Sequence, residues 1–136
     1  MANVHHPKQT SVVVVTLPEE LPATETLELI GAIDDDLRLP LGALVVNGLL
    51  PRLFSDGEAR ELATTLAADA DQGGTVDPSP GASGVRAAAR RAVQERAQAA
   101  SLERLVAGTD LPRIVLPYLF EDAATPAAIE KLSTQF

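Results

Sequence analysis

The side-chain amide of Asn47 is a candidate for recognising a ligand. Asn47 directly follows the apolar run 43–46, which does not alternate with polar residues and is typical of a buried parallel strand. Gly48 and Pro51 are expected to end this strand. Ligands of open parallel sheets bind outside the carboxyl ends of the strands, and an amide carries the donors and the acceptor that match the edge of an adenine ring. The alternative is that Asn47 only starts a turn, which Asn does readily.

The acidic and histidine clusters offer further chemistry, but no base, nucleophile or complete ligand set accompanies them. Glu19 and Glu20 follow the first apolar run, and residues 34–36 are three consecutive aspartates. Both groups could bind magnesium, yet we favour solvated helix ends. His5 and His6 are the only histidines and lack the further ligands that a metal needs, so we interpret them as a solvated tail. The sequence therefore predicts no catalytic residue and no metal site.

Length, charge and composition exclude several classes of function for this chain. A chain of 136 residues suits one domain. The net charge of −8 argues against binding of nucleic acid or of an anionic membrane surface, and the lack of cysteine excludes thiol chemistry. No apolar run approaches the roughly 20 residues of a membrane span. Residues 1–10 lack the apolar core of a secretory signal and are expected to form a flexible segment, so a cytoplasmic protein is expected.

The remaining pattern predicts the elements that position Asn47. Three unalternating runs predict parallel strands at 12–16, 44–47 and 114–116, each covered on both faces. Between the first two runs, apolar residues at helical spacing predict a helix over 22–37, which gives a right-handed crossover. The last helix is expected over 127–134. The fold class is α/β, half of a doubly wound sheet with about three parallel strands and covering helices.

A helical insertion is expected over 55–108 within the domain 11–136. Ser55-Asp56-Gly57-Glu58 predicts the start of a helix that continues to about residue 70. The segment 72–84 is rich in Gly, Pro and Ser, which predicts a flexible loop. The helix over 85–107 is rich in arginine. A basic helix suggests nucleic acid, but we prefer a solvated, salt-bridged helix because the rest of the chain is acidic.

Four segments in order resemble the C-terminal part of the anion-transporting ATPases, which include the arsenical pump-driving ATPase and the ATPase that targets tail-anchored membrane proteins. The segments are VVVTLPEE at 13–20, ETLEL at 25–29, LVVN at 44–47 and LPYLF at 116–120. Each motif is weak alone, but their order and spacing cover almost the whole chain, from about 11 to 136. The resemblance implies a P-loop NTPase-like, three-layer fold.

The resemblance also assigns roles to residues. It implies that Asn47 helps to recognise adenine and that Pro117, Tyr118, Leu119 and Phe120 pack around the base. It implies ATP and Mg²⁺ as cofactors, a homodimer, and a pump or membrane-protein cargo as partner. From the residues alone, Tyr118 and Phe120 suit either a wall against a flat ring or a hydrophobic staple for the last helix.

The departures from the family are as informative. No G-x-x-x-x-G-K-[ST] occurs, and the two lysines, Lys8 and Lys131, lie outside any glycine-rich loop. The Cys-x-x-Cys zinc site of the targeting branch is absent as well. We therefore expect a base-binding part that is inactive alone and needs a P-loop half, on the same or an upstream polypeptide, as partner. The alternative is a noncatalytic interaction module that keeps the fold.

Overall fold

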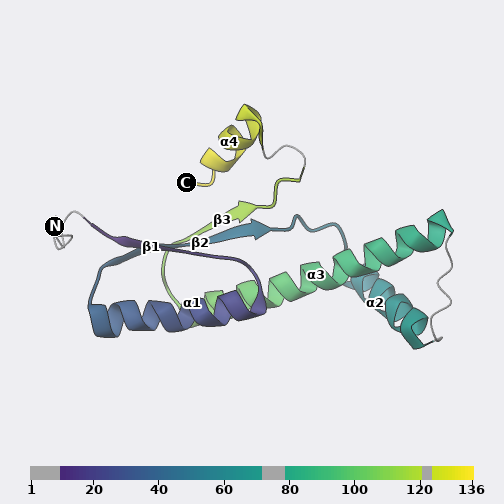
Figure 1. Ribbon diagram of the computed structural model, residues 1–136, viewed down its shortest axis with the longest axis horizontal. Helices are drawn as coiled ribbons and strands as arrows, with labels where there is room; N and C mark the ends of the chain where they lie inside the picture. Colours follow the sequence, from purple (N-terminus) through teal and green to yellow (C-terminus); the bar gives the residue numbers. More distant parts are fainter. Residues whose placement is uncertain (1–9, 72–78, 121–123) are drawn as a thin grey trace. The chain divides into compact units, whose positions relative to one another are not determined.

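The computed structural model describes residues 10–71, 79–120 and 124–136 (Figure 1). The chain divides into two compact units. The first contains the chain up to Leu50 and again from Gln98 onward, and the second is Pro51–Ala97. The N-terminal segment with the histidine pair and residues 72–78 of the predicted loop lie outside the described residues.

The first unit is built on three parallel strands in the order β1-β2-β3. These are β1 (Val12–Thr16), β2 (Leu41–Leu49) and β3 (Arg113–Pro117). The predicted α/β class with a three-stranded parallel sheet and covering helices is confirmed. The expectation that Gly48 ends the second strand is wrong, because β2 continues to Leu49 through an irregularity in its pairing with β3.

The helix α1 and the end of α3 pack on one face of this sheet. The expected helix over 22–37 is α1 (Glu20–Ala32) followed by one π-helical turn, η1 (Ile33–Leu37), which holds the three aspartates. The carbonyl of Ile33 accepts hydrogen bonds from the backbone N–H groups of Arg38 and Leu39, and Arg38 turns the chain with a left-handed φ of 51°. The last helix is α4 (Pro126–Ser133).

The hydrophobic core of the first unit lies between the sheet, α1 and the end of α3 (Pro80–Gly108). Leu44, Val46 and Leu105 are fully buried in it. The expectation that the first strand is covered on both faces is wrong, since Val13 and Val15 are 51% and 62% exposed. The reason is that alternate residues of β1 point away from α1, and the described residues leave Val13 and Val15 largely uncovered on that face.

The second unit contains α2 (Asp56–Asp71) and the first part of α3. As predicted, Ser55 starts α2: its hydroxyl and its N–H donate to a Glu58 carboxylate oxygen at 2.7 and 2.8 Å. The predicted loop 72–84 is too long, because α3 begins at Pro80 with Ser79 accepting from the Ala82 N–H. Sequence reading overlooked that capping signal.

An ion pair is visible on α3, where we predicted a salt-bridged helix, but it is mostly buried and not solvated as we expected. The Arg91 guanidinium lies 2.7 Å from the Glu95 carboxylate, and both side chains are mostly buried. Glu95 also accepts from the Leu53 N–H, and Arg91 donates to the Pro51 carbonyl. The pair therefore serves to hold the segment that leads into α2.

Gly108 tests the packing of α3 on α1. A β-carbon there would lie 2.6 Å from both methyl carbons of Leu27, so Gly108→Ala should overpack the core and lower the free energy of unfolding by about 1–3 kcal/mol. Gly31→Ala is the matched control in α1, where a β-carbon meets nothing within 4 Å and better helix propensity should leave stability equal or higher. Denaturant unfolding of both variants checks this, and an unchanged midpoint for Gly108→Ala would contradict it.

The capping contact at Ser55 makes a second prediction. Hydrogen bonds from the Ser55 hydroxyl and then from its N–H hold the pKa of Glu58 below its ordinary value of 4.5. Their contribution to stability is therefore present above the ordinary carboxyl pKa and is lost as the pH falls through the lowered pKa. Ser55→Ala should raise the pKa of Glu58 toward 4.5, as measured by NMR titration of its carboxyl carbon. A pKa that stays equally low in the variant would show that the hydroxyl is not the main cause.

Candidate functional site

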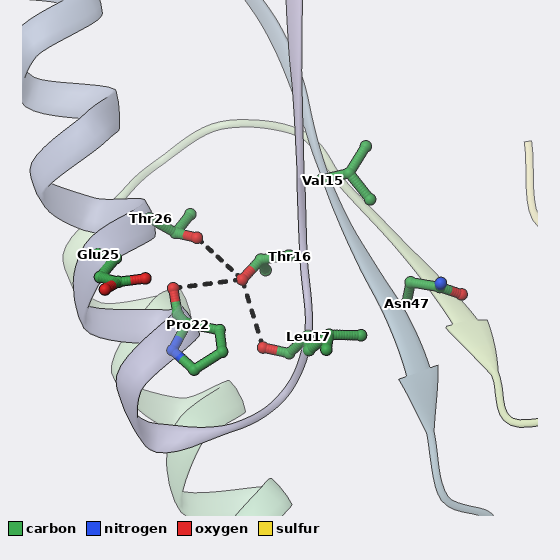
Figure 2. A pocket seen from close by; sticks show the side chains of 7 residues that line it. All are labelled: Val15, Thr16, Leu17, Pro22, Glu25, Thr26 and Asn47. Atoms are coloured by element: carbon green, nitrogen blue, oxygen red, sulfur yellow. Dashed lines mark hydrogen bonds between the residues drawn. The ribbon is translucent and has the colours of Figure 1, made fainter.

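Asn47 lies in β2, in register with Leu116 of β3. Its side chain is exposed, and no described residue hydrogen-bonds its amide. Figure 2 shows the Asn47 and Val15 side chains on the side of the sheet that faces away from α1, whereas Thr16 points toward α1. Asn47 therefore does not cap a turn with its side chain, and the amide is open to a ligand.

A β-bulge follows Asn47 directly. The pairing with β3 passes from Asn47 opposite Leu116 to Leu49 opposite Pro117, so that Gly48 is the extra residue. Its φ of +79° belongs to the left-handed region that glycine adopts at little cost. Gly48 is thus needed for the backbone direction of a bulge rather than as the stop signal that we predicted.

The segment after β3 lies beside this bulge. The N–H of Tyr118 donates to the Leu49 carbonyl at 2.7 Å, and a β-carbon on Gly48 would lie 3.8 Å from Tyr118 Cδ2. Tyr118 and Phe120 pack edge to face with ring centroids 4.8 Å apart, yet they are 49% and 57% exposed. An exposed aromatic pair beside the strand suits a wall for a flat ligand. A staple is less well supported, since Ile129 in the first turns of α4 is 71% exposed.

Asn47 also lines a hollow of about 280 Å³, which lies on the side of β2 toward β1 and α1 (Figure 2). Its walls come from the end of β1, from α1 and from β2; they are Val15, Thr16, Leu17, Pro22, Glu25, Thr26 and Asn47. The lining includes none of the residues 117–120. The structure therefore brings Pro117 and Tyr118 to the bulge, where they contact Leu49, but places the whole segment outside the hollow.

The lining residues that sequence reading missed are those of β1 and α1. Glu25 contributes an exposed carboxylate, which accepts hydrogen bonds from N–H or O–H groups and repels phosphate. With the Asn47 amide, it makes the hollow suited to the base or sugar of a nucleotide rather than to its phosphates. The short connection between the predicted first strand and the following helix, at 16–20, was the sequence signal that could have indicated this hollow.

Two buried hydroxyl groups fix the wall of this hollow. Thr26 donates to Thr16 Oγ1 at 2.8 Å, and Thr16 in turn has the carbonyls of Leu17 and Pro22 at 3.3 Å (Figure 2). Both threonines are buried. The contacts hold the first turns of α1 against the end of β1.

The acidic clusters are exposed in the structure. Glu20 lies 3.9 Å from Arg104 in a solvated ion pair, and the three aspartates of η1 are exposed. Across the described ranges, no group of three or more His, Cys, Asp or Glu residues is arranged to hold a metal ion.

A scan against protein-family models finds no match to this chain, and a search of the curated proteins finds no match either. None of the helices described is both long and apolar enough to cross a membrane.

The hydroxyl pair gives a prediction about the wall. Thr26→Val keeps the shape but leaves Thr16 without its donor, so it should reduce the free energy of unfolding by about 1–2 kcal/mol. Thr65→Val on α2 is the control, because that hydroxyl is exposed and contacts only the Glu61 carbonyl of its own helix. Equal stability of both variants in denaturant unfolding would contradict the role given to the pair.

Proposed function

We propose that this chain is the adenine-recognition part of an ATPase of the anion-transporting type, which acts when it is joined to a P-loop half. In this proposal Asn47 reads the edge of the base, and the segment Pro117, Tyr118, Leu119, Phe120 packs beside it. The phosphates, Mg²⁺ and the hydrolytic machinery belong to the P-loop half. The complete enzyme would couple ATP binding and hydrolysis to transport or targeting in the cytoplasm.

One observation carries the proposal. The Asn47 amide is exposed on a parallel strand, has no described hydrogen-bond partner and is followed by a bulge against which an exposed aromatic side chain packs. An unpaired planar donor and acceptor beside an aromatic ring supports recognition of a flat heterocycle. The hollow with Glu25 adds room of the scale of a base and a sugar but disfavours phosphate, in line with a part that binds one end of a nucleotide.

The nucleotide preference of the chain tests this proposal. We expect ATP to bind the isolated chain with a Kd of about 1 mM, or about −4.1 kcal/mol, because no phosphate-binding loop contributes. Asn47→Ala should weaken ATP relative to GTP by about 1–2 kcal/mol, the scale of a lost hydrogen bond with an unsatisfied partner. The two nucleotides carry equal charge, so repulsion by the acidic chain cancels in the comparison.

NMR titration with both nucleotides at constant ionic strength measures this preference. Gln94→Met, at an exposed position of α3, is the control for a surface change. Equal losses for ATP and GTP in Asn47→Ala, or no loss at all, would mean that Asn47 does not read the base.

Hydrolysis gives a separate prediction. The purified chain should show no magnesium-dependent ATP hydrolysis above background, because its sequence contains no phosphate-binding loop. A phosphate-release assay with and without EDTA measures it. Turnover that survives purification and is lost on Glu19→Gln or Glu20→Gln would overturn the proposal in favour of a self-sufficient hydrolase.

A noncatalytic interaction module is the second candidate, favoured by the surface of β1. This strand is at the edge of the described sheet; its Val13 and Val15 are 51% and 62% exposed, and Leu17, directly after it, is 44% exposed. An apolar edge strand can accept a strand from a partner. The coding sequence immediately upstream separates the two candidates: an in-frame P-loop supports the ATPase, and its absence favours the module.

A further inference from the structure

The bulge after Asn47 is held by one side chain from a distant part of the sequence. The amide oxygen of Gln98, on α3, accepts from the Leu50 N–H at 2.8 Å, and its amide nitrogen donates to the Gly48 carbonyl at 3.4 Å. A bulge interrupts the ladder and leaves backbone groups without strand partners. The single amide of Gln98 satisfies one donor and one acceptor of this kind.

The side chain of Gln98 is buried, so the loss of these two hydrogen bonds would not be fully compensated by water. Gln98 is 7% exposed, so its amide has little access to water, and Gly48 and Leu50, whose backbone groups it contacts, are partly buried. On the other side of the bulge, the backbone N–H of Tyr118 donates a hydrogen bond to the Leu49 carbonyl. The peptide groups from Gly48 to Leu50 are therefore fixed alternately from α3 and from the segment after β3.

We propose that Gln98 is a positioning residue that sets the direction of the Asn47 amide and thereby the preference for adenine. Asn47 is anchored on its N-terminal side by the ladder with β3, and its C-terminal neighbour is Gly48, whose flexible backbone is held in place by Gln98. In this proposal, loss of Gln98 removes the contact to the Gly48 carbonyl, so that the backbone next to Asn47, and with it the direction of the Asn47 side chain, is held less firmly. This inference rests on the proposed function of Asn47.

Two substitutions separate positioning from stability. Gln98→Met keeps the approximate volume and removes both hydrogen bonds, whereas Gln98→Glu keeps an acceptor for the Leu50 N–H and loses the donor to Gly48. Both should reduce the ratio of ATP to GTP affinity by about fivefold, the equivalent of one net hydrogen bond, toward the ratio of Asn47→Ala. Gln94→Met, on the exposed side of the same helix, should keep the ratio of the unaltered chain.

The affinities come from NMR titration of the full chain with ATP and with GTP, and each spectrum also reports whether the variant is folded. Should both Gln98 variants fail to fold, Gly48→Ala perturbs the same bulge through its positive φ while its β-carbon meets only an ordinary 3.8 Å contact with Tyr118. It should lower the same ratio.

The outcomes are distinguishable. If Asn47→Ala loses the preference for ATP while a folded Gln98→Met, or Gly48→Ala in its place, retains it in full, the inference is overturned and the proposed function stands. If the unaltered chain shows no preference, or Asn47→Ala leaves it intact, the proposed function fails and the inference falls with it. A matched loss of preference in Asn47→Ala and the Gln98 variants, with Gln94→Met unaffected, supports both.

Discussion

The pairing of β2 with a neighbour on each side is the constraint on which the structure of the first unit depends. Leu44 and Val46 of β2 are fully buried against α1 and Leu105, and the same strand sets the register of β1 and β3. Side chains alternate along a strand, so this burial sends Asn47 to the opposite face. The exposure of the amide is thus a consequence of packing the core.

The irregularity at Gly48 interrupts the pairing of β2 with β3. A regular strand would have continued the ladder with β3, but the bulge inserts one residue and requires a positive φ. Its backbone groups are satisfied by Gln98 and Tyr118, which come from α3 and from the segment after β3. Bulges often occur next to binding sites, and this one directly follows the amide that sequence reading had singled out.

Local chemistry explains what the sequence could predict. The β-branched run at 12–16 gave the bounds of β1, and Ser55 with Glu58 gave the start of α2, because both signals lie within a few residues. The coverage of β1 was mispredicted, since a run of valines does not say whether both faces of its strand are covered. Likewise, nothing local in the three aspartates marked a π-helical turn.

Only part of the candidate site could be predicted, because sequence signals report local structure and not tertiary contacts. Asn47 and the segment 117–120 were proposed from the sequence and its resemblance, whereas Glu25 and Gln98 were not named as candidates. Gln98 meets its partners 48 and 50 residues away along the chain, so its role follows from tertiary packing alone. A glutamine on a helix is otherwise indistinguishable from a solvated one such as Gln94.

The most direct measurement of the central claim is the set of nuclear Overhauser effects between bound ATP and the chain. If Asn47 and the exposed aromatic pair receive the base, the H2 and H8 protons of adenine should show contacts to the ring protons of Tyr118 and to the side-chain amide of Asn47. Contacts that are absent at millimolar ATP, or that appear only at residues remote from the Gly48 bulge, would contradict the account.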